Sequence, residues 1–259
     1  MTTLKDRIAA GQPTLGSWIT LAHPAIAEIM ADAGFDWLVI DMEHSVIDLR
    51  EAADLIRTIE LKGVSPLVRL TSNSPDLTKR VMDAGAHGVV VPMVANRGDA
   101  ERAVSAVKYP PMGSRGVGLA RAQGYGTRFE EYAATINARS IVVAQIEHVD
   151  AVNCLDEILA VPGIDATLIG PYDLSASMGK PGRYDDPDVH EVLARYEAIS
   201  DRAGKPRGFH VVEPDAAATL AKQRAGYSLV AFSVDFLFLG KSCREGVRAV
   251  RAGAAERSA

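Results

Sequence analysis

Short apolar runs recur along the chain, and segments with helical periodicity separate them. The runs are rich in valine, isoleucine and leucine, which is typical of strands buried on both faces of a parallel sheet. Eight such strands that alternate with helices predict an α/β fold of the (β/α)8 barrel type, the TIM barrel. We expect the strands at residues 15–20, 37–41, 66–70, 88–92, 141–147, 165–170, 207–211 and 227–233.

Local residue chemistry marks the ends of the helices between these strands. Asp48 with Glu51 and Thr127 with Glu130 predict capping boxes, and Ser74 stands before a proline suited to the first helical position. Glycines shortly before several strands predict the points where helices stop. The pattern therefore reads as one continuous alternation of helices and strands.

The chain has 259 residues, which is the usual size of one barrel, and no linker divides it. We therefore expect a single domain over residues 1–259. A helix is predicted at 149–160, and a final helix at 235–250 either closes the barrel or packs on a partner subunit. The long segment 109–125 interrupts the alternation, and segments of this length in compact domains are usually functional or disordered.

Charge and hydropathy exclude several classes of partner. The formal net charge is -5, and lysine and arginine are scattered, so no surface for nucleic acid is indicated. No apolar stretch reaches the length of a membrane span, and the first residues carry no apolar leader. We expect a soluble cytoplasmic protein whose ligand is a small molecule. Two cysteines are too few for a disulfide framework.

Acidic residues follow two apolar runs that a helical segment separates. Glu147 ends one run and Asp173 follows the next. Parallel neighbours place both carboxylates at the same end of the sheet, and two hard oxygen donors favour Mg²⁺ or Mn²⁺ with positions left open for substrate. The alternative is that one acid, Asp173 above all, only caps the next helix.

Four more polar residues belong to the C-terminal ends of strands, where barrels build their active sites. Arg69 is the only charge in its strand and needs an anionic partner, either a substrate oxyanion or a purely structural salt bridge. Asp41 and His44 are close enough for a carboxylate to orient an imidazole as a general base, although a lone histidine is often structural. His210 lies in the seventh strand.

Lysine is missing from these positions. No lysine stands inside a predicted strand or at its C-terminal tip, where a Schiff base would form. Carbonyl chemistry at this site would therefore need a metal ion. The Gly170-Pro171 turn beside Asp173 suggests backbone amides that could bind a small carboxylate.

At these residues the sequence resembles the HpcH/HpaI aldolase family of metal-dependent class II pyruvate aldolases, which includes the aldolase of 4-hydroxy-2-oxoheptanedioate. The resemblance covers nearly the whole chain. Six motifs carry it together: GFDWLVIDMEH at 34–44, VR at 68–69, VPMV at 91–94, YPPMGSRGVG at 109–118, QIE at 145–147 and IGPYDLS at 169–175.

The resemblance implies a homo-oligomeric barrel, commonly a hexamer, in which C-terminal helices exchange between subunits. It implies Mg²⁺ or Mn²⁺, with Co²⁺ as a further candidate, as the cofactor. It implies that Glu147 and Asp173 hold the metal, that Arg69 holds the keto oxygen and its enolate, and that His44 with Asp41 forms a base dyad acting through a metal-bound water. The substrate-binding residues it implies are Arg69, Gly170, Pro171, Tyr172, His210 and, near a neighbouring subunit's site, Asp83.

The expected reaction is the reversible aldol cleavage of a 4-hydroxy-2-oxo acid to pyruvate and an aldehyde. Two departures from the family pattern should change the preference for the aldehyde. Tyr172 stands where a small residue is common, and residues 209–212, which include His210, replace a more aliphatic seventh strand. Two alternatives use the same enolate: a citrate-lyase-like enzyme that acts on acyl-CoA, and an oxaloacetate decarboxylase. A non-catalytic barrel that binds an oxo acid is an alternative of another class.

Overall fold

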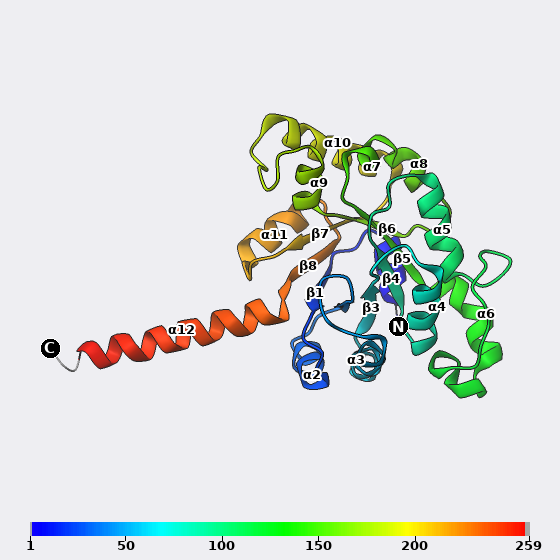
Figure 1. Ribbon diagram of the computed structural model, residues 1–259, viewed down its shortest axis with the longest axis horizontal. Helices are drawn as coiled ribbons and strands as arrows, with labels where there is room; N and C mark the ends of the chain where they lie inside the picture. The colour runs from blue at the N-terminus through cyan, green and yellow to red at the C-terminus, as the bar shows by residue number, and fades with distance from the viewer. Residues whose placement is uncertain (1, 257–259) are drawn as a thin grey trace.

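The computed structural model describes residues 2–256, and it shows a closed parallel barrel surrounded by helices (Figure 1). Each strand pairs with the next along the chain, and the last pairs with the first. The predicted (β/α)8 barrel is confirmed, with strand ends that differ from the prediction by one or two residues. The strands are β1 Thr14–Ile19, β2 Trp37–Asp41, β3 Ser65–Arg69, β4 Gly88–Val91, β5 Ile141–Ile146, β6 Ala166–Ile169, β7 Arg207–Val211 and β8 Leu229–Val234.

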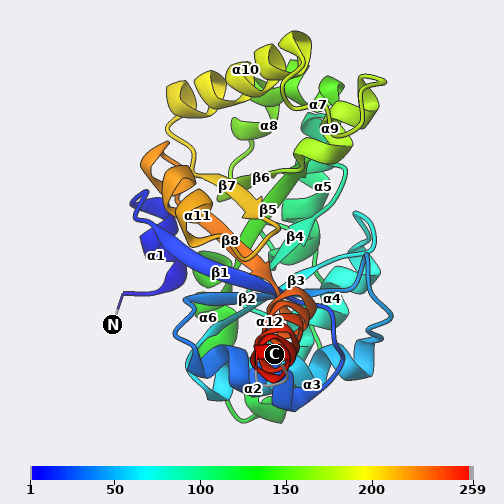
Figure 2. The ribbon, with the colours of Figure 1, turned by 90° about the vertical axis from the view of Figure 1, so that its left-hand side faces the viewer.

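Helices cover the outside of the barrel, as Figures 1 and 2 show from two sides. The predicted helix at 149–160 is two short helices, because the chain leaves helical geometry at Cys154. The helices are α1 Leu4–Ala9, α2 Pro24–Asp32, α3 Leu49–Leu61, α4 Pro75–Ala84, α5 Arg97–Val107, α6 Phe129–Arg139, α7 Val149–Asn153, α8 Leu155–Leu159, α9 Pro171–Ser177, α10 Pro187–Ala203, α11 Ala216–Arg224 and α12 Asp235–Glu256, with a 3-10 helix η1 at Arg121–Gly126.

The helix caps agree with the sequence in most places. Asp48 and Glu51 form the predicted capping box of α3, and Ser74 caps α4 before Pro75. The box predicted for Thr127 is wrong, because Arg128 is the N-cap of α6 and no side chain caps it. The Thr127 hydroxyl instead donates to the carbonyl of Gly124, at 2.7 Å.

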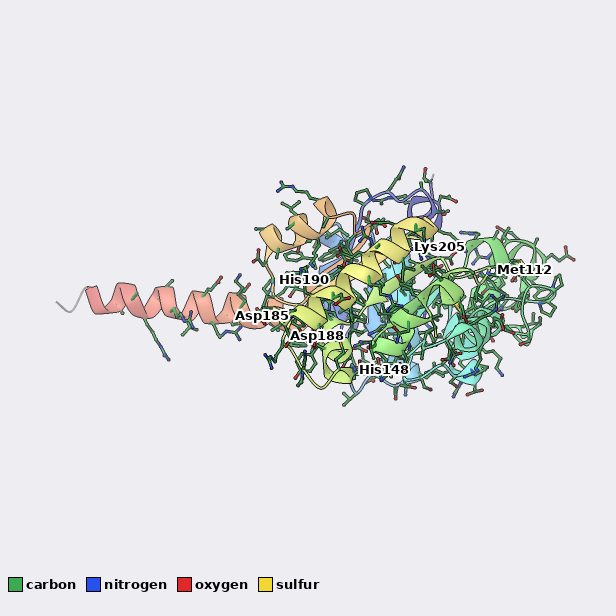
Figure 3. All side chains as sticks on the ribbon, turned by 90° about the horizontal axis from the view of Figure 1, so that it is seen from above. Met112, His148, Asp185, Asp188, His190 and Lys205 are labelled. Atoms are coloured by element: carbon green, nitrogen blue, oxygen red, sulfur yellow. The ribbon has the colours of Figure 1, made fainter. Side chains whose placement is uncertain are left out.

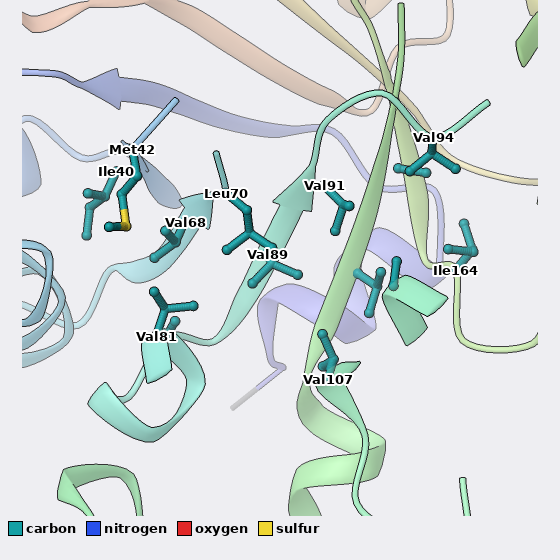
Figure 4. Packing of buried hydrophobic residues seen from close by; sticks show 14 of the residues in the cluster. Ile40, Met42, Val68, Leu70, Val81, Val89, Val91, Val94, Val107 and Ile164 are labelled. Carbon is teal, nitrogen blue, oxygen red and sulfur yellow. The ribbon is translucent and has the colours of Figure 1, made fainter. Parts of the chain in front are cut away.

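Side chains on each strand alternate between the barrel interior and the helix layer. Val39, Leu67 and Val90 pack inside the barrel, where Leu4 and Ile8 of α1 close its N-terminal end. The strand residues next to them, such as those labelled on β3 and β4 in Figure 4, pack against the helices. This alternation fixes which polar residues can point into the mouth at the other end.

The last helix leaves the barrel. α12 projects far beyond the other helices in Figures 1 and 3, so of the two alternatives predicted for this helix, the one in which it closes the barrel of its own chain is wrong. Its first residue is anchored, because the Asp235 carboxylate accepts hydrogen bonds from the backbone of Thr20 and Leu21, each at 2.8 Å. Apolar side chains further along the helix are exposed, among them Leu239 and Val250.

Candidate active site

The alternation inside the barrel places five sequence-predicted residues at its C-terminal mouth. Asp41 and Arg69 end β2 and β3, and they share the interior face with Val39 and Leu67, two residues earlier on each strand. By the same count Glu147, Gly170 and His210 follow the interior positions of β5, β6 and β7. Strand ends far apart in the sequence therefore meet in one place, where barrels carry their active sites.

Arg69 and Asp41 form a bidentate ion pair across two adjacent strands. Their Cα positions are paired in the β2–β3 register. The Arg69 Nε donates to Asp41 Oδ1 at 2.9 Å, and Nη2 donates to Oδ2 at 2.6 Å. Burial by itself would raise the pKa of Asp41, but the hydrogen bonds and charge of Arg69 outweigh it and lower the pKa. The carboxylate is therefore ionised, and it holds the guanidinium plane.

The guanidinium also lies on an aromatic ring. The Arg69 Cζ is 4.4 Å from the centre of the Trp18 ring. Within residues 2–256, Nη1 takes part in no hydrogen bond, so its two N–H groups remain available at the mouth. The anionic partner that the sequence required is thus Asp41, and the arginine keeps donors for a second anion.

The turn after β2 corrects the expected Asp41 and His44 dyad. Asp41 Oδ1 accepts the backbone N–H of Glu43 at 3.0 Å and that of His44 at 3.1 Å. The imidazole is 67% exposed, and its Nε2 lies 3.7 Å from Glu43 Oε2. Asp41 therefore positions the backbone of His44 rather than its ring, because the planar guanidinium matches both carboxylate oxygens better.

Glu43 is a site residue to which the sequence-based prediction assigned no role. Its Oε2 is buried without a hydrogen-bond partner in the described chain and lies 3.5 Å from Arg69 Nε. Burial raises the pKa of Glu43, the charge of Arg69 opposes the rise, and the charge of Glu147 adds to it. Its place two residues after Asp41, beyond the strand end, was the available signal.

Glu147 is held by two donors in the mouth. Its Oε2 accepts the backbone N–H of Met93 at 3.0 Å, and its Oε1 accepts the side-chain amide of Gln145 at 2.6 Å. Burial raises the pKa of Glu147, and the charge of Asp173 raises it further. Gly170 makes room for it, because a Cβ at Gly170 would lie 2.9 Å from Glu147 Cγ.

Asp173 lies in the first turn of α9 and is exposed. The N-cap of α9 is Gly170, and no side chain caps this helix, so the alternative in which Asp173 serves as a cap is not what the structure shows. The amide cradle predicted around Gly170 is smaller than expected. The N–H of Gly170 already donates to the carbonyl of Ile146 at 2.9 Å, and Pro171 has none, which leaves the amides of Tyr172 and Asp173.

The donor set fits a divalent ion that keeps open positions. No group of three or more histidine, cysteine, aspartate or glutamate side chains within residues 2–256 could hold a metal. The site instead offers the two carboxylates of Glu147 and Asp173, and the charge of Asp173 raises the pKa of Glu147. A cation between the two carboxylates would relieve this repulsion. Gln145 Oε1 is buried beside Glu147 without a partner. These are hard oxygen atoms of the kind that Mg²⁺ and Mn²⁺ prefer.

His210 forms part of the interior wall beside the ion pair. Its Nε2 lies 3.1 Å from the carbonyl of Ser233, and its ring centre is 5.4 Å from that of Trp18. Burial lowers the pKa of His210 to about 4, and the nearby charge of Arg69 contributes. The imidazole is therefore neutral near pH 7, and it donates to Ser233.

Asp83 lies elsewhere, in the packing of the long 109–125 segment. Burial raises the pKa of Asp83, and the charge of Arg115 opposes the rise. Arg115 is itself buried, 4.1 Å from the centre of the Tyr109 ring, and donates to the Tyr132 hydroxyl at 3.0 Å. The segment is thus ordered against α4 and α6, and the structure does not bring Asp83 to Arg69 or Glu147 of the same chain.

A pocket of about 590 Å³ opens at the opposite end of the barrel. The ion pairs of Arg7 with Asp36 and of His87 with Glu60 line it. Barrel residues at this end serve stability rather than chemistry.

No helix within residues 2–256 is both long and apolar enough to cross a membrane.

Comparison with known proteins adds independent information. A family model described as HpcH/HpaI aldolase/citrate lyase matches residues 14–240. The chain is 36% identical over 255 residues to the hydroxypyruvate/pyruvate aldolase of Paraburkholderia phytofirmans, covering 96% of this chain and 97% of that one. It is 36% identical over 251 residues to the 2-keto-3-deoxy-L-rhamnonate aldolase of Escherichia coli, covering 96% and 93%. A crystal structure of an HpcH/HpaI aldolase/citrate lyase family protein from Burkholderia cenocepacia has a TM-score of 0.91 at 36% identity, covering 97% of this chain and 100% of that chain.

Proposed function

The chain belongs to the HpcH/HpaI aldolase/citrate lyase family and is an aldolase, and we propose that it reversibly cleaves 4-hydroxy-2-oxo acids to pyruvate and an aldehyde with a divalent metal ion. One observation supports this most strongly. Arg69, fixed by Asp41, keeps free N–H groups in the same mouth as the carboxylates of Glu147 and Asp173. A cationic donor opposite two metal-type carboxylates suits a substrate that becomes an enolate.

Glu147 and Asp173 would hold the ion, which is Mg²⁺ or Mn²⁺ by the hardness of its donors, with Co²⁺ as a further candidate. When bound, such an ion supplies Lewis-acid stabilisation of the negative charge that develops on an enolate. Gln145 keeps Glu147 in place through the 2.6 Å hydrogen bond to Oε1. A fixed carboxylate keeps the site organised before substrate arrives.

Arg69 is the group that receives the developing charge. Its guanidinium is immobilised by two hydrogen bonds to Asp41 and by the Trp18 ring, so it needs no rearrangement during the reaction. Donors that are oriented in advance toward a developing oxyanion typically contribute a factor of about 10²–10³ in rate. The free Nη1 group is the donor that would contact the keto oxygen of the substrate.

We assign the proton transfer to the exposed imidazole of His44. Asp41 fixes the turn that carries this residue by accepting its backbone N–H at 3.1 Å. In cleavage, His44 would take the proton of the 4-hydroxyl group, the C3–C4 bond would break, and the aldehyde would leave. The remaining enolate would then be protonated at C3 to give pyruvate. The amides of Tyr172 and Asp173 would bind the pyruvate carboxylate, with His210 on the neighbouring wall.

We also assign α12 to exchange between subunits in a homo-oligomer, with a hexamer as the expected assembly. α12 leaves its own barrel and exposes Leu239 and Val250, at 54% and 75%. On the helices that flank β8 and β1, Ile29 and Leu220 are exposed at 68% and 49%. A second copy's α12 would cover them, and Asp83 would then face a neighbouring subunit.

The reaction can be tested by supplying pyruvate with a panel of aldehydes and, in parallel, the corresponding 4-hydroxy-2-oxo acids. We expect carbon–carbon bond formation in one direction and release of pyruvate in the other, both dependent on added Mg²⁺ or Mn²⁺. Acyl-CoA substrates and oxaloacetate serve as the comparison. Turnover of an acyl-CoA without any aldol product would instead assign the site to a citrate-lyase-like enzyme.

A further inference from the structure

The segment 178–186, between α9 and α10, is pinned over the helix that carries Asp173. Ser175 is fully buried, and its hydroxyl donates to the carbonyl of Tyr172 at 2.7 Å. The same oxygen accepts the backbone N–H of Gly182 at 2.9 Å. The N–H of Lys180 donates to the Ser175 carbonyl at 2.9 Å. One serine thus ties the segment to the first turn of α9.

The far end of the segment is fixed as well. The Lys180 ammonium bonds to Asp186 at 2.6 Å and also to Asp188, next to the start of α10. Asp188 and its neighbour Asp185 are labelled at this helix end in Figure 3. Asp186 is mostly buried and also caps α10 by accepting the N–H of Asp188. The segment is therefore anchored at both ends.

This anchoring sets Tyr172 against the backbone of the segment. A Cβ on Gly182 would lie 3.3 Å from Tyr172 Cε2, and Gly182 has a φ of +71°, which side-chain-bearing residues rarely adopt. The N–H of Tyr184 donates to the Gly182 carbonyl at 3.1 Å, so the second tyrosine follows in the same turn. Both rings are partly exposed, at 58% for Tyr172 and 45% for Tyr184.

Tyr172 directly precedes Asp173 in the first turn of α9, so the tyrosine pair lies beside this carboxylate. Burial raises the pKa of Tyr184, and the charges of Tyr172 and Asp173 add to the rise. Neither phenol oxygen forms a hydrogen bond within the described residues. Each hydroxyl group therefore keeps a donor that no residue of the described chain uses.

From this geometry we infer that Tyr172 and Tyr184 form a polar wall that binds the hydroxyl groups of the aldehyde, so that the enzyme prefers hydroxylated aldehydes to unsubstituted ones. This inference rests on the proposed aldolase function. The aldehyde must meet pyruvate next to Asp173, and the wall is fixed there by Ser175 and Gly182. Basic groups contribute little to it, because Lys180 and Arg183 are already paired with Asp186.

The decisive variant is Tyr184→Phe, which removes one hydroxyl and keeps the ring. Its kcat/KM would be measured with pyruvate and either glycolaldehyde or acetaldehyde, which differ by a single hydroxyl group. Losing one hydrogen bond to a substrate hydroxyl corresponds to roughly a three- to tenfold fall in the ratio of the two values. Because the ratio is taken within each variant, a shared loss in enolate formation cancels.

Tyr125→Phe is the matched control, because Tyr125 is 72% exposed in η1, outside the mouth. It should leave the ratio at the wild-type value. Ser175→Ala, which frees the segment, should lower the ratio as Tyr184→Phe does. An unchanged ratio in Tyr184→Phe would overturn the inference alone. If the wild-type enzyme reacts with neither aldehyde, the proposed function fails, and the inference falls with it.

Discussion

Arg69 and Asp41 stand side by side on β3 and β2, and two hydrogen bonds of 2.9 and 2.6 Å join the guanidinium to the carboxylate. A buried salt bridge is often only structural, and it is weak evidence for stability. Here the pair leaves Nη1 free at the mouth where Glu147 also lies. The arrangement therefore predicts a catalytic as well as a structural effect of substitution.

Arg69→Ala should lower kcat for aldol cleavage by about 10²–10³ fold, because it removes a fixed donor to the developing enolate. It should also cost about 3–5 kcal/mol in the free energy of unfolding, because Asp41 is left buried and unpaired. Steady-state kinetics and denaturant unfolding measure the two effects separately.

Arg7→Ala provides the matched control for this substitution. Arg7 also makes two hydrogen bonds to an aspartate, Asp36, but at the opposite end of the barrel. It should lower stability and leave kcat close to the wild-type value. Equal kcat in the two variants would reduce Arg69 to a structural role.

His44→Asn should lower kcat for cleavage while the unfolding free energy stays within about 0.5 kcal/mol of wild type, because exposed side chains contribute little to stability. The imidazole is 67% exposed. His190→Asn is the control, since His190 is exposed on α10, a helix to which none of the mouth residues belongs (Figure 3). Unchanged cleavage in His44→Asn would remove His44 from the proton transfer.

Because the pKa of the buried His210 imidazole is lowered, we expect the stability of the fold to depend on pH. Its pKa is lowered from 6.5 to about 4 by burial, with the charge of Arg69 lowering it and that of Asp41 opposing. Between these values the unfolded chain binds more protons than the folded one, so stability falls as the pH drops from about 6.5 to 4. The loss is at most about 3 kcal/mol. His210→Gln should flatten this part of the profile in urea unfolding, and a slope equal to that of wild type would contradict it.

The α12 assignment predicts that Leu239→Asp with Val250→Asp dissociates the oligomer. Both side chains are more than half exposed in the single chain, and charges there would oppose burial against a second copy. Light scattering after size exclusion would show a lower molar mass. Leu61→Asp, at a residue 76% exposed at the end of α3, is the control and should leave the mass unchanged.

Much of this fold was predictable from the chain, for a physical reason. Strands buried on both faces, such as β5 and β6, need uninterrupted apolar runs. The ends of those runs predict the ends of the strands to within one or two residues. The exit of α12 was not predictable, because its sequence is equally compatible with covering β8 or a second copy. The break at Cys154 also left no local signal.

The sequence predicted which residues lie in the candidate site better than it predicted which of them contact one another. Strand-end logic brought Asp41, Arg69 and Glu147 together, and the structure places all three in the mouth. The position of these residues at strand ends does not say which side chain Asp41 binds. Spacing favoured His44, whereas the β2–β3 register aligns Asp41 with Arg69, and register is a property of tertiary structure. Glu43 was passed over for a related reason, since its contacts come from other strands.

The central claim is that this mouth forms a pyruvate enolate only with a divalent ion held by Glu147 and Asp173. The most direct measurement is the exchange of pyruvate methyl protons for deuterium, followed by NMR, because it reports enolate formation without any aldehyde. We expect exchange to fall at least about 100-fold after chelation and dialysis, an effect of the size that electrostatic stabilisation supplies. Mn²⁺ or Mg²⁺ should restore it in wild type but not in Glu147→Gln. Exchange at an undiminished rate in the metal-free protein would contradict the claim.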